Sequence, residues 1–167
     1  MKNTITKNQL YLEYQPLVAS LGVEIVNIMA SETPEEYKMN LIIVLKDGEV
    51  GVNECSRVHK IIKTRMTVQL PPEEYLNLEV STPGLQRTLE DAHEFSLFCG
   101  KRVRVLLPSL QKWVSGIIAS TNEDSVTLSN CIVEEDEKSK DELMKISFDS
   151  IQKAKLEYIW EDRSHGN

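Results

Sequence analysis

The chain has 167 residues, 41% apolar and 27% charged, which is typical of a globular protein with one ordinary domain or two small ones. No apolar run approaches the roughly 18 residues that a membrane-spanning helix needs, and the first residues lack the apolar core of a secretory signal. The three cysteines are an odd number in unrelated settings, which indicates reduced thiols. These features predict a cytoplasmic protein.

The charge balance is acidic in both halves of the chain. Net charge is −7, from 19 basic and 26 acidic residues. Residues 1–94 carry 9 basic and 14 acidic side chains (−5), and residues 95–167 carry 10 and 12 (−2). Neither half is the basic body expected of a protein that binds RNA mainly through phosphates. An acidic surface favours a basic partner, although ordinary solubility explains the charge equally well.

The first half of the chain predicts the element order α-β-β-α-β. An apolar stripe over residues 10–21 indicates a helix that Thr4 or Thr6 caps, that Pro16 kinks or restarts and that Gly22 ends. Residues 23–30 and 37–46 form a hairpin of two strands. A second helix follows Asn53 as its N-cap, and residues 75–81 alternate as a third strand. Two helices on one face of a three-stranded sheet is the simplest packing.

A sharp elbow follows the third strand. Pro83 and Gly84 predict a type II turn with positive φ at the glycine, after which Leu85 and Leu89 return to the core. Arg87 falls between them on an exposed bend. One interpretation is a joint between domains. The other is a binding elbow that offers donors to an anion or a partner from Ser81, Thr82, the Gly84 backbone and Arg87.

The second half predicts an all-β domain. A short helix brings Phe95 and Phe98 inward and ends at Gly100, and five short strands follow over residues 102–159. Closing such a sheet into a small barrel removes its exposed edges. The change of period places the domains at residues 1–95 and 96–160, and residues 161–167 read as a flexible tail.

Basic residues gather at the start of the expected barrel. Arg102 and Arg104 share one face of its first strand, Lys101 lies at the entry, and Lys112 and Trp113 open the second strand. Cations beside an aromatic ring can contact the backbone and bases of RNA. The alternative is a solvated basic face with Trp113 packed in the core.

The sequence offers little for catalysis or metal binding. Cys55 and His59 have ligand spacing on a helix, but no second pair completes a site and Cys55 belongs to an apolar stripe. There is no nucleophile-elbow or nucleotide-binding glycine motif. We therefore expect no enzyme, no catalytic residues, no metal and no cofactor. A hydrolase that uses Ser81 stays the least favoured alternative.

Four segments resemble the ribosome maturation factor RimP family, in the family's order, across residues 12–158. They are GVNECSRVHKII, EVSTPGLQRTL, EFSLFCGKRVRV and ISFDSIQKAKLEY. Gln86 stands where the family has Asp, and Thr88 where it has Pro, so a role that needs an Asp–Arg pair at the elbow does not carry over. The resemblance implies an α/β domain followed by an SH3-like, Sm-type barrel.

The resemblance also implies a function. It implies a factor for assembly of the small (30S) ribosomal subunit, associated with 16S rRNA maturation and with incorporation of the basic twelfth small-subunit protein. We expect this factor to be a monomer. The acidic balance suits a protein that receives such a partner. A general RNA-binding module and a peptide-binding barrel without a ribosome-specific role remain open.

Overall fold

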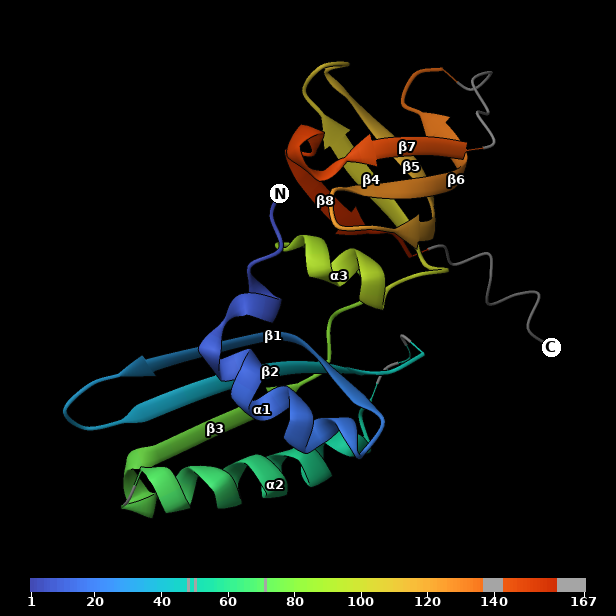
Figure 1. Ribbon diagram of the computed structural model, residues 1–167. Helices are drawn as coiled ribbons and strands as arrows, with labels where there is room; N and C mark the ends of the chain where they lie inside the picture. The colour runs from blue at the N-terminus through green and yellow to red at the C-terminus, as the bar shows by residue number, and fades with distance from the viewer. Residues whose placement is uncertain (48, 50, 71, 137–142, 159–167) are drawn as a thin grey trace. The chain divides into compact units, whose positions relative to one another are not determined.

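The computed structural model describes residues 1–47, 49, 51–70, 72–136 and 143–158 (Figure 1). The expected flexible tail at 161–167 lies outside the described residues. Contacts between residues divide the chain into two compact units, Thr4–Pro83 and a second unit that joins Met1–Asn3 to the chain from Gly84 onward. Their separability as domains remains a prediction.

The first unit has the expected order of helices and strands. Its elements are a 3-10 helix η1 (Ile5–Lys7), α1 (Gln9–Ala19), β1 (Val23–Glu32), β2 (Tyr37–Leu45), α2 (Glu54–Gln69), a 3-10 helix η2 (Glu73–Tyr75) and β3 (Leu76–Ser81). The sheet has the order β1-β2-β3, with β1 antiparallel and β3 parallel to β2. Both β1 and β3 are therefore edge strands.

Both helices of the first unit cover one face of this sheet. Helix α1 packs on β1, α2 packs on β3, and the two helices touch each other. The buried residues alternate along the strands, as one apolar face requires. The core consists of Tyr14, Val18, Val23, Ile25, Ile28, Met39, Leu41, Ile43, Val58, Ile62, Met66, Leu76 and Leu78.

The helix ends differ in part from the sequence prediction. The Asn8 side chain, not a threonine, caps α1 by accepting the Leu10 N–H at 2.8 Å. Pro16 lies inside α1, which runs unbroken to Ala19, and Gly22 follows with φ +73°. Asn53 occupies the N-cap position of α2 as expected but makes no side-chain capping bond.

The second unit is built on a five-stranded antiparallel sheet. Its order is β7-β6-β5-β4-β8. The elements are α3 (Ala92–Leu97), β4 (Arg102–Leu107), β5 (Lys112–Thr121), β6 (Ser125–Val133), β7 (Leu143–Ser147), a 3-10 helix η3 (Phe148–Ser150) and β8 (Lys153–Leu156). Phe95 of α3 packs on Phe148 with ring centroids 5.4 Å apart, which places the helix against the core of this unit.

The closed barrel expected from the sequence is not confirmed. In the part of the chain that the structure describes, β7 and β8 end the sheet and no pairing joins them. The edge of β8 pairs instead with the segment before α3, where Thr88 forms a β-bridge with Lys155. The fold is therefore mixed α+β with two sheets.

One glycine is required by the close approach of two strands. A Cβ at Gly116 of β5 would lie 3.0 Å from the Leu128 Cβ and 3.0 Å from the Ser129 carbonyl oxygen of β6. The pairing of β5 with β6 shifts register on either side of Ile117, which bends the sheet here. Among the described residues, no helix combines the length and the apolar character needed to cross a membrane.

Candidate functional site

The elbow after β3 turns later than the sequence predicts. The Arg87 N–H donates to the Gly84 carbonyl at 3.2 Å, so the turn runs from Gly84 to Arg87 with Leu85 and Gln86 at its corners. Gly84 does not have the positive φ that a type II turn at Pro83 demands. The predicted turn is therefore wrong. Leu85, expected in the core, is 59% exposed, whereas Leu89 is buried as expected.

Arg87 is not the exposed donor that the sequence suggested. Its side chain is only 12% exposed, and Nε donates to Glu94 Oε1 at 2.5 Å. Its carbonyl accepts the Leu156 N–H, and the next buried residue, Leu89, donates its N–H to the Ala154 carbonyl. The segment is thus held along the edge of β8 by its backbone and against α3 by its side chain.

Glu94 completes this cluster from the first turn of α3. Its Oε2 accepts the backbone N–H groups of Glu90 at 2.7 Å and Asp91 at 3.1 Å, while the Asp91 side chain caps the helix at His93. Glu94 is 1% exposed, and burial raises the pKa of its carboxyl although Arg87 and these N–H groups act to lower it. The Arg87 cation therefore offsets the cost of burying the Glu94 charge.

The four predicted elbow residues differ in exposure and divide between the two units. Ser81 is exposed at the end of β3 and Thr82 is half-buried, and both belong to the first unit. Gly84 is exposed and Arg87 is half-buried, and both belong to the second unit. Arg87 Nη2 is buried without a hydrogen-bond partner, so the two N–H groups on this nitrogen are enclosed within the fold. A binding role for the elbow remains a prediction.

The basic and aromatic residues of β4 and β5 do come together. Val103 and Val105 face the core, so Arg104 between them lies on the outer side of the second sheet. Trp113 lies on the same side. The Arg104 guanidinium carbon is 4.2 Å from the centre of the Trp113 ring, a cation–π contact. Trp113 is half-buried rather than packed in the core, so one part of its ring is available to a partner.

The remaining predicted cations surround this pair. Arg102 is held by Glu157, with Nε 3.2 Å from Oε2. Lys112 Nζ lies 3.9 Å from Glu135 Oε2, an exposed pair that contributes little to stability. Lys101 is half-buried in the loop before β4, where its carbonyl accepts the Ile118 N–H. Arg104 is therefore the cation that the structure places directly on an aromatic ring.

Two further cations of this surface were missed from the sequence. In the β4–β8 register Lys155 lies opposite Arg104, and Lys153 opposite Leu106. Both lysines are exposed, and Ala154 between them is buried. The alternation K-A-K-L could have revealed this face, but the partner strand of β8 was not evident. We call the surface of Arg102, Arg104, Trp113, Lys153 and Lys155 the cationic face.

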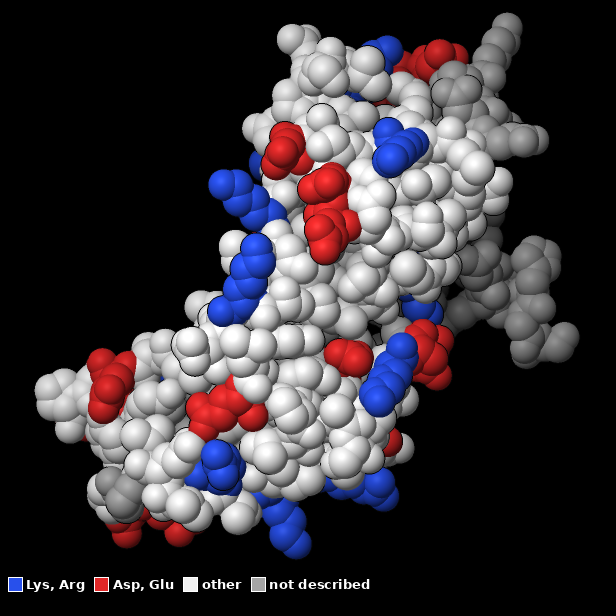
Figure 2. Space-filling model, in the orientation of Figure 1, with Lys and Arg blue, Asp and Glu red and all other residues white. Residues whose placement is uncertain are grey.

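The charges of the cationic face differ from the mixed charges on the side of the molecule that Figure 2 shows. Figure 2 shows acidic and basic side chains interspersed over the visible surface. On the outer side of β4 and β8 lie four cations, namely Arg102, Arg104, Lys153 and Lys155. The acid Glu157 is paired with Arg102. Local positive charge next to an aromatic ring is suited to phosphates and bases.

The described residues hold no group of three or more potential metal ligands. The Cys55 thiol donates to the Gly51 carbonyl at 3.4 Å, and burial raises its pKa. His59 points instead to β3, where Nε2 lies 3.2 Å from the Leu78 carbonyl oxygen. Cys55 therefore faces the core, and His59 faces the edge of the sheet.

The fold defines a mixed α+β protein of two compact units, the second of which exposes a cationic and aromatic sheet face.

Two comparisons with known sequences identify similar proteins. Residues 13–86 match the model of the RimP N-terminal domain. The chain is also 24% identical over 149 residues, 89% of its length and 94% of the relative's, to "Ribosome maturation factor RimP" of Borrelia garinii subsp. bavariensis. Both matches support the RimP family, and the match to its N-terminal domain covers residues 13–86.

Proposed function

We propose that the protein is a ribosome maturation factor that binds the immature small (30S) ribosomal subunit. The name of the relative, which aligns with nearly the whole chain, supports a role in ribosome maturation. The observation that carries the proposal is the stacking of Arg104 on Trp113 within the cationic face. On this proposal the protein binds without catalysis, works in the cytoplasm as a monomer, and its second unit is an open relative of the SH3-like barrel.

The cationic face is suited to RNA, and here that means 16S rRNA. Arg104 and Lys155 lie side by side across the strands, and Trp113, opposite Leu106, lies diagonally across from Arg104 on the same face. Lysine and arginine neutralise phosphates, and the partly exposed ring of Trp113 offers a plane for an unpaired base.

The acidic remainder of the molecule supports a second partner. With net charge −7, the protein attracts a strongly basic protein over a range set by the Debye length. The twelfth small-subunit protein, which the family resemblance names, is basic. We propose that it is captured first through acidic surface and that contacts to rRNA through the cationic face are secondary.

Sedimentation tests this function. Tagged protein is run on sucrose gradients with small-subunit precursors and with mature small and large subunits. We expect co-sedimentation with the precursors, and release as salt rises. An Arg104→Glu, Lys155→Glu variant should be displaced at lower salt, whereas Lys7→Glu, Lys46→Glu, at exposed lysines of the first unit, should match the wild type. Equal binding to every RNA-containing particle would favour a general RNA-binding module, and no binding to any particle a peptide-binding one.

A further inference from the structure

The two edges of the first sheet are covered by different kinds of side chain. At β1 the neutral amide of Gln15 accepts the Ile25 N–H at 2.8 Å and donates to the Val23 carbonyl at 3.2 Å. At β3 the covering groups come from α2: His59 Nε2 lies 3.2 Å from the Leu78 carbonyl oxygen, and Lys63 Nζ donates to the Leu76 carbonyl at 3.4 Å. Side chains of the two helices thus cover both edges of the sheet, and lysine is a common cover for an edge strand.

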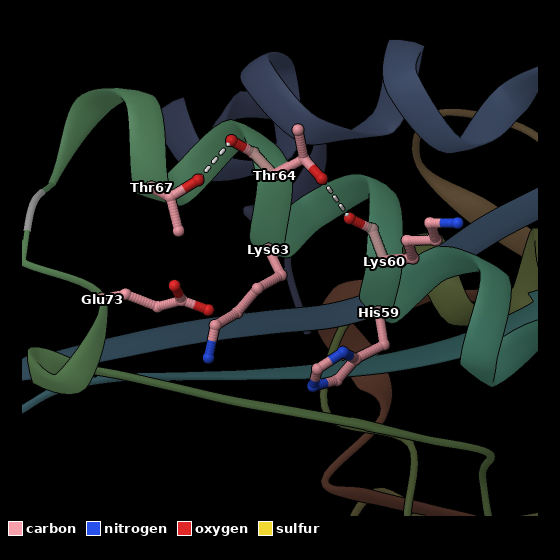
Figure 3. A pocket seen from close by; sticks show the side chains of 6 residues that line it. All are labelled: His59, Lys60, Lys63, Thr64, Thr67 and Glu73. Atoms are coloured by element: carbon pink, nitrogen blue, oxygen red, sulfur yellow. Dashed lines mark hydrogen bonds between the residues drawn. The ribbon is translucent and has the colours of Figure 1, made fainter.

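A hollow of about 350 Å³ lies beside this covered edge (Figure 3). Figure 3 shows Lys63 and the His59 ring hanging from α2 toward β3, and Glu73 of η2 facing Lys63. This is the size of the smaller ligand pockets. Six residues line it: His59, Lys60, Lys63, Thr64, Thr67 and Glu73.

The donors in the hollow are suited to a phosphate. An ammonium group carries three N–H bonds, and the Leu76 carbonyl takes one from Lys63. That bond holds the ammonium in place and leaves two donors for a ligand, so Lys63 is pre-organised rather than free to rotate. Lys60, one turn earlier and exposed, adds a second cation. Together they exceed the single carboxylate of Glu73.

The acceptors in the hollow are suited to a sugar hydroxyl. Thr64 Oγ1 donates to the Lys60 carbonyl at 2.8 Å and Thr67 Oγ1 to the Thr64 carbonyl at 2.9 Å, so each hydroxyl proton is already used. Their oxygens, with the carboxylate of exposed Glu73, can therefore only accept. A ligand that fills the hollow must bring an anion for the lysines and hydroxyl donors for these acceptors.

We propose that the hollow between α2 and η2 binds one ribose-phosphate unit of single-stranded RNA. The phosphate contacts Lys63, and exposed Lys60 adds positive charge at the rim. The ribose 2′-hydroxyl donates to Glu73, and the base stacks on the His59 ring. DNA supplies the phosphate but not the hydroxyl. An acidic peptide supplies the anion but would bring no hydroxyl to Glu73. This site lies in the first unit and is independent of the cationic face.

The test is an NMR titration of the full ¹⁵N-labelled chain with hexauridylate and with its deoxy counterpart, which differ only in the 2′-hydroxyls. We expect saturable shifts of the amides of residues 59–67 and 73, with the RNA bound several-fold more tightly. Lys60→Gln, Lys63→Gln should weaken RNA binding roughly tenfold and make its salt dependence shallower. Lys7→Gln, Lys46→Gln is the matched control and should titrate as the wild type.

Glu73→Ala gives the sharper readout. Glu73 is exposed, so the variant should keep the wild-type spectrum elsewhere. We expect it to bind the two oligonucleotides equally, by losing affinity for RNA while affinity for DNA stays or rises. Equal binding of both oligonucleotides to the wild type, no shifts at α2, or shifts there with polyglutamate alone would each overturn the proposal. Shifts confined to residues 102–115 and 153–155 would overturn it too, and would leave the function of the cationic face intact.

Discussion

Two arginines of the second unit, seventeen positions apart in the chain, have opposite environments. Arg87, at the elbow, is 12% exposed and bound to a buried carboxylate, and its backbone pairs with β8. Arg104, on the cationic face, lies against a half-buried tryptophan and opposite an exposed lysine. The Arg87 charge is paired with Glu94 inside the fold. The Arg104 charge is directed at solvent and is available to a partner.

The difference shows how burial decides what a cation can do. A buried ion pair that loses one partner leaves an uncompensated charge, so Arg87 is required for stability. A cation–π pair at a surface contributes about 0.5–1 kcal/mol, so Arg104 can be exchanged at little cost to the fold. The predictions below test this division, beginning with the largest expected effect.

The largest effect should come from cutting the chain on either side of the elbow. A fragment that begins at Gly84 keeps Arg87, Leu89 and Phe95, whereas one that begins at Ser96, the boundary expected from the sequence, loses all three. Leu89 and Phe95 are 2% and 0% exposed, and removing buried side chains of this size costs about 2–5 kcal/mol each. We expect a cooperative urea transition for the longer fragment and none for the shorter. Identical transitions would contradict the structural role given to the elbow.

Replacing Arg87 alone should have the next largest effect. Arg87→Met leaves Glu94 buried beside an apolar side chain, and breaking a buried pair in this way costs about 3–5 kcal/mol. The control is Arg104→Met, for which we expect a loss of about 1 kcal/mol or less. The measurement is the free energy of unfolding in urea at pH 7. Equal losses at the two positions would abolish the distinction between them.

The loss at Arg87 should depend on pH with a definite sign. Burial already raises the pKa of Glu94, and removing the cation raises that pKa further. The folded variant then holds the proton more tightly than the unfolded chain. Its stability is therefore greatest below the unfolded pKa of about 4.3 and falls as pH rises through the folded pKa. Adding Glu94→Gln to the variant should flatten this profile, and a slope of the opposite sign would contradict the assignment.

Charge reversal on the cationic face should change binding rather than stability. Arg102→Glu, Arg104→Glu is titrated with a purified 16S rRNA fragment and, separately, with the isolated basic twelfth protein. If the face contacts phosphates, RNA affinity should fall at least roughly tenfold and the salt slope should become shallower by about one to two. Binding of the basic protein should persist or strengthen, because acidic surface holds it. If the variant loses RNA binding and the basic protein does not bind even the wild type, the proposed protein partner is wrong.

The sequence predicted the fold well where apolar periodicity is strong. The stripe of Val58, Ile62 and Met66 and the alternation of Leu76 and Leu78 identify α2 and β3, and all five residues are buried. Closure of the second sheet was not predictable in this way. It depends on whether β7 pairs with β8, and periodicity says which face of a strand is buried but not which strand lies beside it.

The site was predicted in part, and the reasons are local. Arg102, Arg104 and Trp113 were found because alternation fixes which face of a strand they share. Lys155 was missed because it reaches that face only through the β4–β8 pairing. Arg87 was misread because its partner Glu94 is seven residues away, across a turn of unpredicted geometry. Turn chemistry at Pro83-Gly84 favoured a positive φ that the backbone does not adopt.

The smallest effect should come from Gly84. With ordinary φ and no heavy atom within 4 Å of a Cβ built there, Gly84→Val has neither strain nor a clash to overcome. We expect the stability of the second unit to change by no more than about 0.5 kcal/mol. The matched control is Gly100→Val, where φ is +87° and nothing lies within 4 Å of the added Cβ, so strain alone should cost about 1–3 kcal/mol.

Thermal unfolding of both variants compares a glycine that the backbone requires with one that it does not. A loss at Gly84 as large as that at Gly100 would restore the type II turn. An unchanged melting temperature together with weaker binding to subunit precursors would instead identify Gly84 as a place where the partner approaches the backbone, and would assign the elbow a binding role beside its structural one.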